Sequence, residues 1–101
     1  LVLLNDPQYV QAARDLAQRT MDEGGKSIEQ RIEFLFRRAT SRKPDPAERN
    51  ILVDRFRNLL EKFRKNPTAT RDLVQDNDPE QAAWTVIASI VLNLDEVITR
   101  E

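Results

Sequence analysis

The sequence predicts an all-α protein, a compact bundle of about five helices with a central, largely buried C-terminal helix. Apolar residues recur every three to four positions along most of the chain, which is the spacing of one helix face. Four of the five prolines follow an Asp or Asn, and such a pair favours a helix start. The Asx side chain accepts from the free amides of the first turn, where proline, lacking an N–H, needs no partner. The pairs are Asp6-Pro7, Asp45-Pro46, Asn66-Pro67 and Asp78-Pro79.

The first three helices are expected over residues 7–23, 28–41 and 46–65. Each has one apolar face for a common core and polar side chains elsewhere. A glycine pair ends the first helix. Capping boxes, in which two residues three positions apart satisfy each other's backbone amides, begin the second and third. The residues concerned are Gly24-Gly25, Ser27 with Gln30, and Asp45 with Glu48.

The last two helices are expected over residues 67–75 and 79–98. The shorter one has few apolar side chains, and we expect it to bridge longer neighbours. The longer one is apolar on almost every side through its middle, which is typical of a buried helix. It contains some β-branched residues, but its length favours a helix over a strand. We expect Trp84 to contribute the largest buried area.

The composition excludes several kinds of active site. The 101-residue chain has no histidine and no cysteine, so it cannot hold a Ser-His-Asp triad, a thiolate nucleophile or a His/Cys zinc site. Its only two glycines are adjacent, which excludes a P-loop and a dinucleotide-binding turn. We therefore expect no cofactor and no enzyme activity from this domain alone.

Charge and length point to a single ordinary domain over residues 1–101. With 16 basic and 17 acidic side chains, the net charge of -1 gives no general attraction to nucleic acid or to an anionic membrane. No apolar run is long enough to span a bilayer. Because the chain begins with Leu1 and not with methionine, we expect it to be a piece of a larger multidomain protein.

A basic cluster at the end of the second helix is a candidate phosphate site. It contains Arg37, Arg38, Arg42 and Lys43. Acidic residues follow at once, however, and no aromatic residue is interleaved for base stacking. The alternative is a solvated helix end that complements the helix dipole, and this is our prediction, with no nucleic-acid partner.

Acidic residues supply two further candidates. Near the fourth helix, Asp72, Asp76, Asn77 and Asp78 resemble a calcium loop, but the central glycine that such a loop needs is missing. A carboxylate pair for glycoside cleavage is a second option. The acids fall mostly on outward helix faces or at caps, where they stay ionised, so we expect neither a metal site nor a general acid.

The first four residues, Leu1-Val2-Leu3-Leu4, are all apolar. They either fold back onto the bundle near its first turn or dock on a preceding domain. We favour internal packing, because four exposed apolar side chains would promote association. Phe34, which lies off the apolar stripe of its helix, could extend such a surface together with Val97 and Ile98.

The ends and the middle of the chain resemble one known family. Residues 3–10, Leu-Leu-Asn-Asp-Pro-Gln-Tyr-Val, are similar to the opening of a family segment, and residues 92–101, Leu-Asn-Leu-Asp-Glu-Val-Ile-Thr-Arg-Glu, are similar to its ending. Residues 31–39 and 42–48 are similar to its middle. The chain thus resembles the C-terminal region of the planctomycete-type domain of unknown function fifteen fifty-three. Ser41 stands where that family usually has glycine, which implies a turn formed differently, and Val97 replaces a common aromatic.

The resemblance implies a cellular location and a parent protein, but no catalytic residues. Members are large exported proteins that often carry a planctomycete cytochrome c domain, so we expect a location in the periplasm or cell envelope. The partners would be other domains of the same parent protein. This chain lacks the Cys-x-x-Cys-His motif and would not carry the haem.

We therefore expect a structural or interaction module at the C-terminal end of a larger protein. The candidate interdomain contact is the polar signature that follows the apolar helix centre, and it comprises Asn93, Asp95, Glu96, Thr99 and Arg100. One alternative is a helix end with local pairs such as Glu96 with Arg100. Another is an accessory part of an enzyme active site, with carbohydrate as a candidate substrate, in which Asp95 or Glu96 assists other domains.

Overall fold

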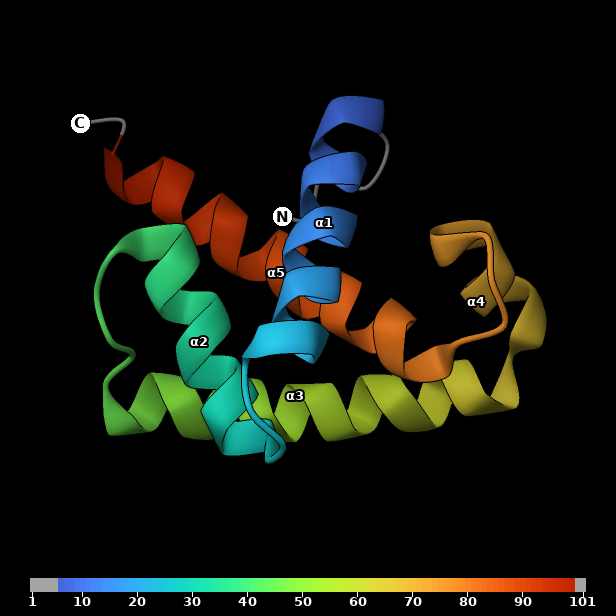
Figure 1. The fold of residues 1–101 in the computed structure, drawn as a ribbon, viewed down its shortest axis with the longest axis horizontal. Coiled ribbons are helices and arrows are strands. Elements are labelled where there is room, and N and C mark those ends of the chain that lie inside the picture. Colours follow the sequence, from blue (N-terminus) through green and yellow to red (C-terminus); the bar gives the residue numbers. More distant parts are fainter. Residues whose placement is uncertain (1–5, 100–101) are drawn as a thin grey trace.

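The computed structural model of the protein describes residues 6–99, and the side chains of residues 6–94. The described chain forms five helices and no strand, which confirms the predicted fold class. They are α1 (Pro7–Glu23), α2 (Ile28–Thr40), α3 (Pro46–Lys65), α4 (Pro67–Val74) and α5 (Pro79–Thr99). The molecule measures 36 × 29 × 22 Å, and α5 runs through its middle (Figure 1).

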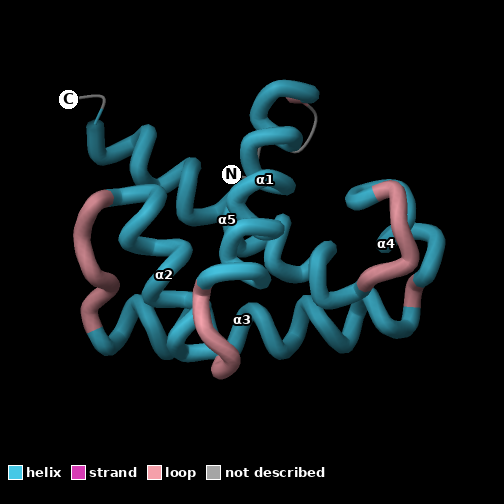
Figure 2. The backbone as a smooth tube through the Cα atoms, viewed as in Figure 1, coloured by secondary structure: helices cyan, strands magenta, loops and turns pink. Residues whose placement is uncertain are grey.

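The capping hydrogen bonds expected at the predicted helix starts are present in the structure. The Asp6 carboxylate accepts from the backbone amides of Gln8 and Tyr9 at 2.9 and 3.4 Å. Both capping boxes form, and the side chain of Asn66 accepts from the Ala69 amide at 3.1 Å. Because each cap fixes a helix start locally, the connections between the helices are short (Figure 2).

The ends of α2 and α4, at Thr40 and Val74, lie within one residue of the approximate ends that the sequence predicts. Ser41 follows α2 with φ 64°, and Gln75 follows α4 with φ 60°. Both residues are in the left-handed conformation, which ends a helix and which glycine adopts most easily. Ser41 thus adopts, despite its Cβ, the conformation that glycine adopts most easily.

The core lies between α5 and the four other helices, all of which contact it. Trp84 is fully buried, as predicted, and its ring stacks on that of Phe56 with centroids 4.1 Å apart. Ala13 and Ala17 on α1 are also fully buried, and their small size lets α1 approach α5 closely. The short α4 contacts both α3 and α5, which confirms its bridging position.

Polar side chains also connect the helices through hydrogen bonds that they donate to backbone carbonyls. The Tyr9 hydroxyl of α1 donates to the Ser89 carbonyl of α5 at 3.0 Å. Arg14 Nε, also on α1, donates to the Leu73 carbonyl of α4 at 2.7 Å. Within the described residues, no helix combines the length and the hydropathy that crossing a membrane requires.

Candidate functional site

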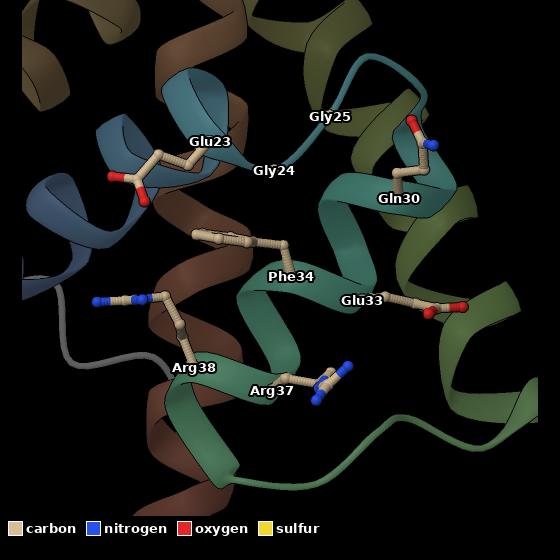
Figure 3. Close-up of a pocket in the computed structure, with 8 residues that line it drawn as sticks. All are labelled: Glu23, Gly24, Gly25, Gln30, Glu33, Phe34, Arg37 and Arg38. Carbon is tan, nitrogen blue, oxygen red and sulfur yellow. The ribbon is translucent and has the colours of Figure 1, made fainter.

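An open pocket of about 640 Å³ lies beside α2. Figure 3 shows that it extends from the turn between α1 and α2 along the outward face of α2. Charged groups, one aromatic ring and the backbone of two glycines line it, and of these glycines Gly24 is buried and Gly25 exposed. The residues are Glu23, Gly24, Gly25, Gln30, Glu33, Phe34, Arg37 and Arg38.

The glycine turn forms one end of the pocket and requires both of its glycines. A Cβ on Gly24 would lie 2.5 Å from the Thr20 carbonyl oxygen, so no side chain fits there. Gly25 has φ 94°, a backbone conformation that side chains with a Cβ rarely adopt. Its ideal Cβ would also lie 2.7 Å from Gln30 Oε1, which accepts from the backbone amides just after the turn. This end of the pocket therefore has a defined shape.

Arg31 holds the same turn from the side of the core. Its Nε donates to the Gly25 carbonyl at 3.0 Å, and its Nη2 donates to the Met21 carbonyl at 3.3 Å. Its Nη1 donates to Glu80 Oε2 at 3.1 Å, and this contact is also an ion pair. The turn is thereby fixed against both α2 and α5.

The acids of the pocket have cationic partners within the chain. Glu33 Oε2 lies 3.2 Å from Arg49 Nη1, and Glu23 Oε2 lies 4.0 Å from Arg19 Nη1. Arg38 Cζ stands 5.6 Å from the centroid of the half-buried Phe34 ring. Arg37 and Arg38 are exposed. In the part of the chain that the structure describes, neither arginine forms an ion pair.

The structure divides the predicted basic cluster into two parts. Arg42 binds Glu48 through two parallel hydrogen bonds of 2.9 and 3.0 Å and lies 4.8 Å over the Phe36 ring. The bonds from Arg42 and the Asp45 amide lower the pKa of Glu48 from 4.5 to about 2, and the same pair raises the pKa of Arg42. Arg42 is therefore committed to the α2–α3 connection. Lys43 is exposed within that connection, and only Arg37 and Arg38 line the pocket.

The acidic cluster forms local contacts. Asp78 Oδ1 accepts from the Gln81 amide at 3.2 Å, which is the predicted cap of α5. Asp76 Oδ1 accepts from the Asn77 amide at 2.7 Å, and Asp72 is exposed on α4. Across the described residues, no three acidic side chains are arranged to hold a metal ion.

The predicted interdomain contact lies at the C-terminal end of α5. Asn93 is half-buried there, next to Leu94, which is 40% exposed. Asp95, Glu96 and Thr99 belong to α5, but their side chains are outside the described set. Arg100 and the apolar segment Leu1-Val2-Leu3-Leu4 lie outside the described residues altogether.

Sequence reasoning missed the pocket as a unit, although one signal pointed to it. Phe34 lies off the apolar stripe of its helix, and Arg37 and Arg38 follow it at three and four positions. That spacing places all three on one helix face. The contribution of the glycine turn became visible only in three dimensions.

The sequence model of the PSD1 family, described as a protein of unknown function (DUF1553), matches residues 1–56. That range includes α1, α2 and the first half of α3, and hence every residue that lines the pocket. No curated protein and no solved structure matches the chain.

Proposed function

The chain belongs to the DUF1553 family, and we propose that it serves as a structural and interaction module that docks other domains of a larger protein. The resemblance of its closing residues to the end of the family segment supports a place at the C-terminal end of that protein. The family's character supports an exported, cytochrome c-associated parent in the periplasm or cell envelope. The family is described as one of unknown function, so the proposal for how this domain acts is based on its surface.

The observation that carries the proposal is the exposure of Leu94. Nearly all of α5 from Ala82 to Val91 is buried, yet Leu94 is 40% exposed only one turn later. Figure 1 shows this end of α5 leading away from the centre of the bundle. Full burial of an exposed leucine side chain contributes about 1.5–3 kcal/mol, so a partner that covers the part of Leu94 that is still exposed gains about 1 kcal/mol. The half-buried Asn93 beside it can supply a directional hydrogen bond.

The test is an association assay between this chain and the remainder of its parent protein. We expect binding at micromolar concentration, and we expect Leu94→Glu to weaken it at least about tenfold, because the new charge would have to be desolvated. Ile51→Glu is the matched control, since Ile51 is also an exposed aliphatic residue, at 67%, but belongs to α3. We expect the control to bind like the unmodified chain.

Two results would contradict docking through α5. One is no association at micromolar concentration, and the other is an equal loss for both glutamate variants. The accessory enzyme role of Asp95 or Glu96 stays a prediction of the sequence. Replacing both by alanine in the full-length protein, with folding checked by circular dichroism, tests that role through the loss of turnover.

A further inference from the structure

We propose that the outward face of α2 binds an acidic peptide segment of another polypeptide. Arg37 and Arg38 would each hold a carboxylate of this segment, and an apolar side chain between them would cover Phe34. The surface is the pocket of about 640 Å³ at the glycine turn (Figure 3). It uses none of the α5 residues that carry the docking proposal, so separate variants test the two.

The pocket follows a single face of one helix. Its α2 residues are separated by three and four positions, which is the repeat of a helix face, whereas Ile32, Leu35 and Phe36 point into the core and are fully buried. From Gln30 to Arg38 this face is about 12 Å long, since a helix rises about 1.5 Å per residue. A short extended segment of a partner can therefore lie along it.

The charges on this face favour an anionic ligand, although the pocket contains as many acids as arginines. Glu33 already forms an ion pair with Arg49 at 3.2 Å, and Glu23 has a longer, exposed contact of 4.0 Å with Arg19 that compensates its charge only in part. Arg37 and Arg38 form no ion pair with any described residue. Two guanidinium groups are thus available to a carboxylate, which arginine binds through two parallel hydrogen bonds.

The directions of the two arginines favour a peptide over a single small anion. Figure 3 shows Arg38 and Phe34 pointing toward the α1 side of the pocket, and Arg37 pointing toward the opposite side with Glu33. The guanidinium groups diverge and do not converge on one small anion such as phosphate. A segment with two carboxylates on either side of an apolar residue matches all three side chains. Its apolar residue would lie on the Phe34 ring, beside the Arg38 that already stands 5.6 Å from that ring.

The test is fluorescence anisotropy with a labelled peptide in which a phenylalanine is flanked on each side by two glutamates. We expect saturable binding at low salt that weakens as the salt concentration rises. Arg37→Glu with Arg38→Glu is expected to weaken binding at least about tenfold. Phe34→Ala, which keeps both arginines, is expected to weaken it about fivefold. Circular dichroism checks that each variant folds.

A second measurement needs no variant. Adding the peptide to the unmodified chain should shift the backbone amide resonances of Gly24, Gly25 and Phe34 in NMR spectra. The matched control for the charge reversal is Arg55→Glu with Lys62→Glu. These two exposed residues of α3 undergo the same change in charge outside the pocket. We expect this control to bind the peptide as the unmodified chain does.

Several results would overturn the proposal. They are the absence of saturable binding, equal binding of a peptide with lysines in place of glutamates, and an equal loss of affinity in the α3 control. Complete displacement of the peptide by inorganic phosphate at equal concentration would show a free-anion site instead. Equal or tighter binding of labelled single-stranded RNA would show a nucleic-acid surface.

Discussion

Arg31 and Glu80 join the first turn of α2 to the first turn of α5 through an ion pair in which Nη1 and Oε2 are 3.1 Å apart. The Arg31 side chain is only 17% exposed, so water screens its contacts less than those of a surface arginine. The same guanidinium donates to the carbonyls of Gly25 and Met21. One side chain thereby connects the end of α1, the glycine turn, α2 and α5.

Arg31→Lys should destabilise the domain. The planar guanidinium group donates to three separate acceptors, which the single ammonium group of lysine cannot reach together. We expect a loss of about 1–2 kcal/mol in the free energy of unfolding, which corresponds to one or two hydrogen bonds. Urea denaturation followed by circular dichroism measures it. Arg19→Lys is the control, since Arg19 and Glu23 form an exposed pair at 4.0 Å that should contribute little. Equal effects of the two substitutions would contradict a structural role for Arg31.

The sequence was sufficient to predict the helices because their starts are set by local chemistry. Asp6, Ser27, Asp45 and Asn66 each cap a helix through a backbone amide within three residues, and an apolar stripe then defines the face that packs. The largely apolar middle around Trp84 likewise identified the central helix. These features depend on neighbours in the sequence, so no knowledge of the tertiary structure was needed.

The candidate site was less predictable because its properties depend on distant partners. Arg31 meets Glu80 across 49 positions, and no local pattern indicates that contact. In the basic cluster, Arg42 is distinguished from Arg37 and Arg38 by its partners after the chain has folded, Glu48 beyond the intervening turn and the Phe36 ring. A helix pattern shows which face a residue occupies, but not which charge lies opposite it.

Ser41→Gly should stabilise the protein by about 1 kcal/mol. Ser41 has φ 64°, and a left-handed conformation costs a residue with a Cβ about 1–2 kcal/mol more than it costs glycine. The greater flexibility of glycine in the unfolded chain offsets part of this gain. Thermal denaturation measures the effect. Ser41→Ala retains a Cβ and should give no increase, so equal melting temperatures for the two variants would argue against strain at this position.

Acid should weaken the contribution of Glu48 to stability. Its pKa in the folded protein is about 2 and its ordinary value is 4.5, so the folded state binds a proton less readily than the unfolded state does. The stabilisation is therefore complete above about pH 4.5 and is lost as the pH falls through the folded pKa, toward 2. Glu48→Gln keeps an oxygen that can accept from the Asp45 amide but removes the charge. The difference between the urea midpoint of Glu48→Gln and that of the unmodified protein should become smaller as the pH falls from about 4.5 toward 2.

The control for this pH series is Glu61→Gln. Glu61 lies in the exposed part of α3, 3.7 Å from Arg64 and 4.0 Å from Lys65, without the parallel bonds that Glu48 receives. We expect its urea midpoint to follow that of the unmodified protein across the same range. A constant difference between Glu48→Gln and the unmodified protein at every pH would show that ionisation of Glu48 does not stabilise the fold.

Ser89→Ala should leave the stability unchanged or raise it by up to about 1 kcal/mol, although Ser89 is fully buried in the core helix. Its hydroxyl oxygen has no hydrogen-bond partner among the described residues, and a buried polar group without a partner is unfavourable. Its carbonyl, which accepts from Tyr9, belongs to the backbone and remains in the variant. Alanine also has the higher helix propensity. Chemical denaturation of both proteins measures the difference.

Thr70→Val is the matched comparison for Ser89→Ala, because it also removes a buried hydroxyl and nearly preserves the shape of the side chain. The Thr70 hydroxyl lies 2.9 Å from the Phe63 carbonyl of α3 and 3.1 Å from the Asn66 carbonyl, so it links α4 to the end of α3. Losing this contact should cost about 1–2 kcal/mol. If Ser89→Ala lowered the free energy of unfolding as much as Thr70→Val does, the Ser89 hydroxyl would have to form a hydrogen bond in the folded protein. Ser89 would then contact neighbouring helices through its hydroxyl as well as through its carbonyl.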